Sequence, residues 1–279
     1  MKAKSRARYI IAALALAVLI MALVCLFVGA SRMSFSDGVA ALFGKGSAAN
    51  VRILRSIRVP RVLAALIAGA ALSVSGLVMQ TTLSNAMASP STMGVSNAAV
   101  FGANLSIIVF AGGFLSTGNN LASYTAGVNP FAASVTAFLF SALSILLILA
   151  LCRVKAFSPN VVVLAGIAVG AIWTAATTLL QFYATDVGLS AAVVWNFGDL
   201  GRATYKTDLL MLCAAVPGLA VFSALAWRYN ALLSGDAAAG SMGVNVSRLR
   251  FFSLLLASLM TAACVSSLGI IGFVGVICP

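Results

Sequence analysis

Histidine and glutamate are absent from this sequence, and its acidic residues are five aspartates in 279 residues. Charged residues make up 8% of the chain, whereas a soluble domain carries about 25%. The aspartates lie outside or at the edges of the apolar segments, so the sequence offers no buried pair of acids for acid–base catalysis and no evident metal cluster. We therefore expect no enzymatic activity, no catalytic residue, and no metal or cofactor.

Hydrophobic residues account for 62% of the chain, which excludes a soluble globule. Apolar runs long enough to cross a bilayer recur from Tyr9 almost to Pro279, with polar breaks between them. The first run is too long for a signal-peptide core, so we interpret it as an uncleaved span. The predicted fold class is an all-α, polytopic transmembrane helical bundle in the lipid bilayer. Its seven complete spans are expected at 9–30, 60–82, 97–115, 130–152, 160–183, 207–228 and 251–267. A polar connection is expected at 31–59, and loops at 84–96 and 185–206.

Basic residues outnumber acidic ones by 17 to 5, which gives a net charge of +12. They form short clusters between apolar runs, which is typical of membrane topology and does not favour a nucleic-acid partner. With a cytoplasmic N-terminus, the clusters at 2–8, 153–155 and 228–250 all lie on the cytoplasmic side. The arginines between the first two spans then face outward, so we expect them to bind an acidic partner.

Small residues favour close packing between the predicted helices. Gly69, Ser73 and Gly76 share one helix face, and Gly166 and Gly170 form a GxxxG pair. The five cysteines lie far apart and mostly inside apolar runs, which indicates small core residues. We assign no chemistry to these positions.

An ordered series of motifs begins at the second span. It comprises Arg58-Val-Pro-Arg61, Ser75-Gly-Leu-Val-Met-Gln80, Asn85-Ala-Met-Ala-Ser-Pro90 and Met93-Gly-Val95. The series resembles the FecCD family, the permease subunits of ABC importers for iron–siderophore complexes, haem and cobalamin. The family pattern is R-x-P-R, S-G-x-x-x-Q, N-P-L-A-x-P and L-G-V, from which this chain departs by Ala86 in place of proline and by Met87 and Met93 in place of leucine.

The resemblance implies roles for these residues. Arg58 and Arg61 are expected at the external mouth of the second span, where they dock acidic residues of a binding protein; lipid headgroups are the alternative partner. Pro60 suits the first turn of a helix, and the chain breaks at Asn85 and Pro90 before the next span. The implied structural and gating motif consists of Gly76, Gln80, Asn85, Pro90 and Gly94.

A second match lies in the hydrophilic segment 229–250. Its run from Ser234 to Arg248 resembles the cytoplasmic loop that, in this family, sits in a groove of the ATPase and transmits its closure. We expect Asp236 to cap a short helix over 237–242 and Gly243 to end it in a left-handed turn. A solvated, capped loop is the alternative. The residues implied in ATPase coupling are Gly235, Asp236, Ala239, Met242, Gly243 and Arg248.

Two further segments resemble the same family. Trp195 and Gly198 match its external W-x-x-G segment, and residues 269–279 match a G-x-I-x-F-V-G-L-x-x-P stretch. In the family about two further spans follow this stretch and complete a ten-helix fold. We therefore expect residues 269–279 to begin an eighth span, within a single permease domain over 1–279 that is incomplete at its C-terminus.

Together these observations favour a permease subunit of an ATP-driven ABC importer in the inner membrane. The expected partners are cytoplasmic ABC ATPase subunits, an extracytoplasmic substrate-binding protein and a second permease copy. The alternative is a secondary transporter of a small solute, which usually keeps ionisable groups at mid-membrane. A membrane-embedded enzyme comes third, because it needs the acid–base side chains that are missing.

Overall fold

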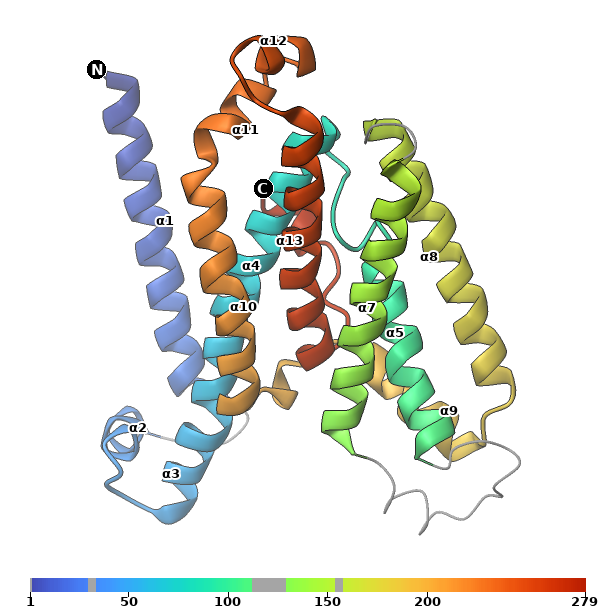
Figure 1. Ribbon diagram of the computed structural model, residues 1–279. Coiled ribbons are helices and arrows are strands. Elements are labelled where there is room, and N and C mark those ends of the chain that lie inside the picture. Colours follow the sequence, from blue (N-terminus) through green and yellow to red (C-terminus); the bar gives the residue numbers. More distant parts are fainter. Residues whose placement is uncertain (1, 30–33, 112–128, 154–157) are drawn as a thin grey trace. The chain divides into compact units, whose positions relative to one another are not determined.

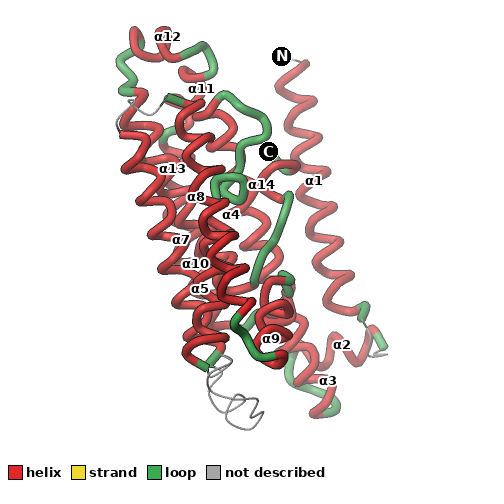
Figure 2. Tube along the Cα trace, turned by 90° about the vertical axis from the view of Figure 1, so that its right-hand side faces the viewer, coloured by secondary structure: helices red, strands yellow, loops and turns green. Residues whose placement is uncertain are grey.

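A computed structural model describes residues 2–29, 34–111, 129–153 and 158–279. Helices dominate, and the described residues contain no strand beyond one isolated bridge between Phe197 and Ile270 (Figures 1 and 2). This agrees with the predicted all-α fold class. The chain divides into two compact units, Met1–Leu66 with Leu200–Asp208, and Ile67–Asp199 with Leu209–Pro279, and each is described by itself.

The first unit contains α1 (Lys2–Phe27), α2 (Phe35–Leu42), α3 (Ala48–Ile53), the π-helical turn η1 (Leu54–Arg58), the 3-10 turn η5 (Leu200–Arg202), and the first residues of α4 (Val59–Leu83) and α10 (Tyr205–Ala224). Arg55 ties its parts together: the guanidinium donates to the Leu42 carbonyl, and the Arg55 carbonyl accepts from the Tyr205 hydroxyl at 2.6 Å. Two short helices, α2 and α3, form within the polar connection predicted at 31–59.

The second predicted span also begins earlier than expected. One continuous helical stretch of 36 residues runs from Ala48 to Leu83, so Pro60 lies inside it and not in its first turn. Proline cannot donate the backbone hydrogen bond of a helix interior and crowds the preceding turn. The π-helical turn that ends at Arg58 stands directly before this site, and such widened turns relieve that crowding.

The second unit is a helical bundle around α5 (Val95–Asn104). Helix α5 packs against α7 (Pro130–Cys152), α8 (Pro159–Phe182) and α13 (Val246–Leu268). Close packing depends on small residues, because a Cβ on Gly102 would lie 2.5 Å from the Thr136 carbonyl oxygen of α7. The remaining elements are η2 (Leu105–Phe110), α9 (Asp186–Asn196), α11 (Ala226–Leu232), α12 (Asp236–Ser241) and α14 (Val274–Ile277).

Six helices among the described residues are long and apolar enough to cross a membrane: Arg8–Phe27, Ala48–Leu83, Pro130–Cys152, Pro159–Phe182, Tyr205–Ala224 and Val246–Leu268. The helix expected at 97–115 is instead the shorter apolar stretch Val95–Phe110, and residues 112–115 lie outside the described part. The predicted loop at 185–206 was also wrong in part, since it contains α9. Thr185 caps α9 by accepting a hydrogen bond from the Gly188 amide, and Trp195 joins a buried cluster with α5.

The C-terminal tail does not continue as a regular span in this structure. Gly269 adopts a positive φ of 85° and Phe273 a positive φ of 63°. Within the described residues 269–279, the one helix is the four-residue α14. A left-handed residue interrupts a right-handed helix, so two such positions break the expected eighth span at its start. Figure 2 shows this tail beside α4.

Candidate functional site: the α12 segment and the contacts of the C-terminal tail

The segment between α11 and α13 forms a short helix between two left-handed glycines. Gly235 has a φ of 98°, α12 spans Asp236–Ser241, and Gly243 has a φ of 82°. The predicted helix and the left-handed turn at Gly243 are therefore confirmed. Ala239 is buried, whereas Met242 is 58% exposed, so α12 has one anchored and one open face. In Figure 1, α12 stands at the end of the second unit where α7 ends and α13 begins.

The predicted capping role of Asp236 was wrong. Gly235 occupies the N-cap and Asp236 is the first residue of the helix. Its carboxylate instead accepts two hydrogen bonds from Arg250, at 2.9 and 2.7 Å, in a bidentate ion pair. This pairing is stronger and more directional than a backbone cap, because both partners are charged.

Arg250 anchors the α12 segment, whereas the sequence interpretation assigned it to topology alone. Its side chain is 4% exposed, and its Nε donates to the Thr82 carbonyl at the end of α4 at 2.7 Å. One guanidinium thus joins α4, α12 and α13. The signal in the sequence was the single acid, Asp236, within a basic segment, but a spacing of fourteen residues between the two does not by itself predict a pair.

Arg248 lies apart from the other residues implied in coupling. It is in the first turn of α13, its amide is capped by Asn245, and its exposed side chain lines a groove with Arg153 at the end of α7. The structure therefore groups Gly235, Asp236, Ala239, Met242 and Gly243 around α12, and places Arg248 in a separate groove.

Three residues of the predicted structural motif meet at the C-terminal tail. Gln80 donates to the Val276 carbonyl at 3.1 Å, and Gly76 faces the backbone of Gly275 so closely that a Cβ could not fit. A Cβ on Gly275 would in turn lie 3.6 Å from Pro90 Cδ. Gly76, Gln80 and Pro90 therefore all contact the C-terminal tail and hold it against α4.

Trp195 and Gly198 hold the beginning of the same tail. Gly198 packs directly on the Ile270 backbone, and a Cβ on Gly269 would lie 2.9 Å from the Trp195 carbonyl oxygen. The Asp199 amide donates to the Leu268 carbonyl at 2.9 Å, next to the Phe197–Ile270 bridge. Asn85, by contrast, has a local role, since its side chain accepts from the Met87 amide in a turn.

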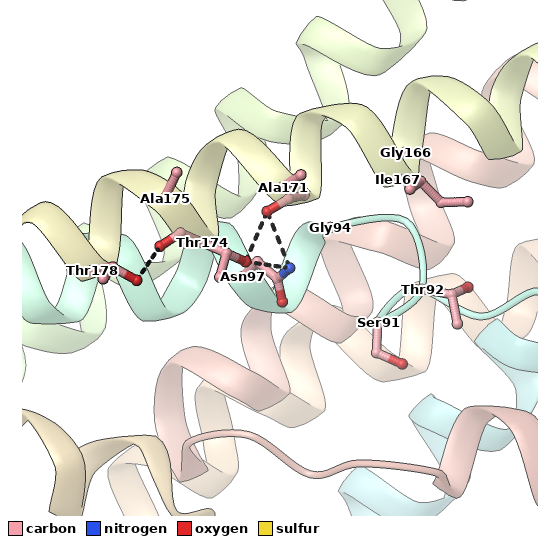
Figure 3. Close-up of a pocket in the computed structure, with 11 residues that line it drawn as sticks. Ser91, Thr92, Gly94, Asn97, Gly166, Ile167, Ala171, Thr174, Ala175 and Thr178 are labelled. Atoms are coloured by element: carbon pink, nitrogen blue, oxygen red, sulfur yellow. Dashed lines mark hydrogen bonds between the residues drawn. The ribbon is translucent and has the colours of Figure 1, made fainter.

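Gly94 begins a groove between α5 and α8, shown in Figure 3. Gly94 has a φ of 75° and packs on the GxxxG pair of α8, because a Cβ on Gly94 would lie 2.8 Å from the Cα of Gly170. Asn97 donates to the Gly170 carbonyl and to the Thr174 hydroxyl, both at 3.2 Å. The groove has a volume of about 630 Å³, and exposed Thr174 and Thr178 continue it along α8.

The two predicted docking arginines differ in their environments. Arg58 is 7% exposed, and its Nη1 donates to the carbonyls of Leu26 and Phe27 at the end of α1, both at 2.9 Å. The expectation of a surface guanidinium therefore fails for Arg58, because carbonyls at a helix C-terminus attract a cation. Arg61 is exposed, as expected of a docking residue.

Among the described residues, no group of three His, Cys, Asp or Glu side chains could hold a metal ion. Outside the spans, burial raises the pKa of the Tyr229 hydroxyl, and the hydrogen bond with Ser253 and the charge of Arg228 lower it by smaller amounts.

Known proteins resemble this chain in sequence and in fold. A family model described as the FecCD transport family matches residues 16–279. A protein of Methanocaldococcus jannaschii named as an ABC transporter permease is 42% identical over 255 residues, covering 91% of this chain and 72% of the relative. A Helicobacter pylori protein named as an iron chelatin transport system permease is 34% identical over 227 residues, covering 81% of this chain and 64% of the relative. A solved structure, described as an inward-facing conformation of a metal-chelate type ABC transporter, matches with a TM-score of 0.79 and 25% identity, covering 97% of this chain and 79% of its own.

The fold and the matched residues define a multi-pass membrane permease of the ABC transporter class, not an enzyme. The chain belongs to the FecCD transport family. It spans 72% and 64% of the lengths of the two relatives above.

Proposed function

We propose that this chain is the membrane-spanning subunit of an ATP-driven importer for metal chelates of the iron–siderophore, haem or cobalamin kind. In this proposal residues 1–279 belong to one permease domain in the inner membrane, with a cytoplasmic N-terminus. Support comes from the family match and from the names of relatives, one of which refers to iron chelatin transport.

The observation that carries the proposal is the exposed α12 segment. Gly235 and Gly243 fix the two turns, buried Ala239 anchors the helix, and exposed Met242 offers an apolar contact. The Asp236–Arg250 pair ties this surface to α4 and α13. A rigidly anchored helix can pass the movement of a bound ATPase to the membrane helices, whereas a mobile loop cannot.

The groove along α8 supports a second permease copy. Thr174 and Thr178 are exposed residues on a helix long and apolar enough to span a membrane, and their hydroxyls donate to the Gly170 and Thr174 carbonyls. Polar groups in membrane spans usually face a protein neighbour or a water-filled path and not lipid. We propose that two copies meet along this face and enclose the substrate path. T178C is then expected to form intermolecular disulfides, whereas L179C, one position around the helix, is not.

Arg61 is the docking residue we propose for an extracytoplasmic binding protein. Its guanidinium is exposed, and arginine can hold a carboxylate through two parallel hydrogen bonds. Arg58 supports it by fixing the end of α1. Arg61→Glu is expected to slow association with the binding protein at low salt, while exposed Arg52→Glu has less effect; equal effects would contradict this assignment.

Reconstitution tests the function. Proteoliposomes holding this permease, its ABC ATPase and its binding protein are expected to accumulate ferric siderophore, haem or cobalamin only when ATP is supplied. Gly243→Val, which strains a φ of 82°, is expected to abolish coupling, and Gly46→Val, with similar strain at a φ of 110° in the first unit, is the matched control. ATP-independent accumulation would contradict an ABC mechanism.

Secondary transport is the alternative, and one residue favours testing it. Asp208 in α10 is 4% exposed, and neither carboxylate oxygen has a hydrogen-bond partner in the part of the chain that is described. An ion-coupled carrier would use such a group. In our proposal Asp208→Asn leaves ATP-driven uptake intact; uptake that is driven by a proton gradient and lost in D208N would favour the carrier.

A further inference from the structure

A second groove, with basic residues at its rim, lies between α7 and α13 within the second unit. It has a volume of about 420 Å³. Arg153 and Arg248 stand at its rim, and its walls are apolar, formed chiefly by Leu146, Leu149, Phe251 and Phe252. Of the residues assigned above to transport, Arg248 is the one that lines this groove, and it lies apart from the α12 segment.

The groove has a charged rim and an apolar floor. The distance between them matches the distance from lipid headgroups to acyl chains at a membrane surface. Arg153 directly follows α7, and Arg248 lies in the first turn of α13, so both stand at the same end of two antiparallel spans. Leu149 and Phe252 are one helical turn further in, about 6 Å deeper, and Leu146 is about 10 Å deeper than Arg153. A molecule with an anionic head and an apolar chain matches this order.

The charges at the rim are uncompensated within the described part of the chain. Neither arginine side chain makes a hydrogen bond or an ion pair there, and no aspartate lines the groove. The nearest acid in sequence to Arg248, Asp236, is already bound by Arg250. Phe252 and Leu146 are 60% and 53% exposed, so the apolar walls are open to the bilayer.

We propose that this groove binds an anionic phospholipid, with its phosphate between Arg153 and Arg248 and an acyl chain along Phe252 and Leu146. Basic pockets between membrane helices at the headgroup level commonly bind such lipids. An ATPase surface would satisfy the arginines but not the apolar walls, which run about 10 Å into the span. The lipid would brace α13 next to Arg250, and it would thereby stabilise the base of the α12 segment.

The test uses the full chain in detergent, without any transport partner. Phosphatidylglycerol, phosphatidylcholine and inorganic phosphate are titrated separately, and bound species are counted by native mass spectrometry. We expect phosphatidylglycerol to bind more tightly than phosphatidylcholine, and Arg153→Gln or Arg248→Gln to weaken its binding about five-fold each. Phe252→Ser tests the apolar wall and is expected to weaken both lipids.

Arg228→Gln is the matched control, because Arg228 is exposed in α11, stacks 5.3 Å from the Trp227 ring and lies outside the groove. It is expected to keep the lipid preference. A double variant, R153Q with R248Q, that still prefers phosphatidylglycerol would overturn the proposal. So would inorganic phosphate that competes equally well with the lipid. None of these outcomes depends on whether the chain transports metal chelates.

Discussion

Arg250 shows how much can depend on one residue in a chain with few acids. Its side chain is buried, and each of its donor nitrogens has a partner, on Asp236 or Thr82. The side chain of Asp236 is 53% exposed, whereas that of Arg250 is 4% exposed. If the ion pair were broken, water could reach the aspartate far more easily than the arginine. The pair is therefore asymmetric.

This asymmetry makes a prediction about single substitutions. Asp236→Ala leaves a buried guanidinium without its counter-charge, whereas Arg250→Met leaves an aspartate that water can reach. We expect D236A to lower the free energy of unfolding by about 3 kcal/mol and R250M by less. Thermal unfolding in detergent measures the order of the two variants. A larger loss for R250M would mean that its Thr82 contact, and not the charge pair, dominates.

Tyr229 makes a prediction about pH. Burial raises the pKa of its hydroxyl above the ordinary value of about 10, and the hydroxyl is 2.7 Å from Ser253 Oγ. Since the folded state holds this proton more tightly, the stability that it contributes is present below pH ~10 and is lost as pH rises beyond that. Tyr229→Phe is expected to flatten the fall in stability above pH ~10. An unchanged slope in alkaline denaturation curves would exclude this contribution.

At the scale of elements, glycines decide which helices approach closely. From the sequence, several small residues were equally good candidates for close helix contacts, yet their surroundings in the structure differ. Gly94 lies against Gly166 and Gly170, and Gly76 lies against Gly275, whereas a Cβ on Gly69 would meet no atom within 4 Å. The predicted packing face of Gly69, Ser73 and Gly76 therefore makes a close backbone contact only at its Gly76 end.

Alanine substitutions distinguish these positions. Gly94→Ala combines a positive φ with a close contact on α8, so we expect a loss of about 1–3 kcal/mol in stability. Gly69→Ala, inside α4 and in open space, is expected to gain about 0.5–1 kcal/mol from lower backbone entropy in the unfolded chain. Denaturation of both variants in the same detergent measures the contrast. Equal effects would show that helix propensity alone decides them.

At the scale of the whole molecule, the distribution of charge predicts the orientation in the membrane. The basic clusters at 2–8, 153–155 and 228–250 favour a cytoplasmic N-terminus and an external connection between the first two spans. The exposed Ser47, the N-cap of α3, is a suitable reporter in this connection. In a cysteine-free background, S47C is expected to react with an impermeant thiol reagent added from outside. Labelling from the cytoplasmic side alone would reverse the topology.

Hydropathy and motif order were enough to assign the class of this protein. Long apolar runs predicted a helical membrane fold, and the ordered motifs from Arg58 to Gly243 predicted the family, because hydropathy and local spacing are written directly in the chain. The sequence also predicted the turn at Gly243, since only a local backbone conformation was involved. The sequence interpretation assigned the residues of α9 to a loop, because a short capped helix between spans has little hydrophobic periodicity of its own.

Contacts between residues far apart in the sequence became visible only in the folded chain. The tertiary structure paired Arg250 with Asp236 and Thr82, buried Arg58 under the end of α1, joined Gly76 and Gln80 to the C-terminal tail, and brought Arg153 beside Arg248. Such pairs depend on how each helix is rotated and how closely it packs. The helices of this chain are apolar almost all round, so the periodicity of the sequence does not specify their rotation. The close contacts of glycines and of buried charges specify it instead.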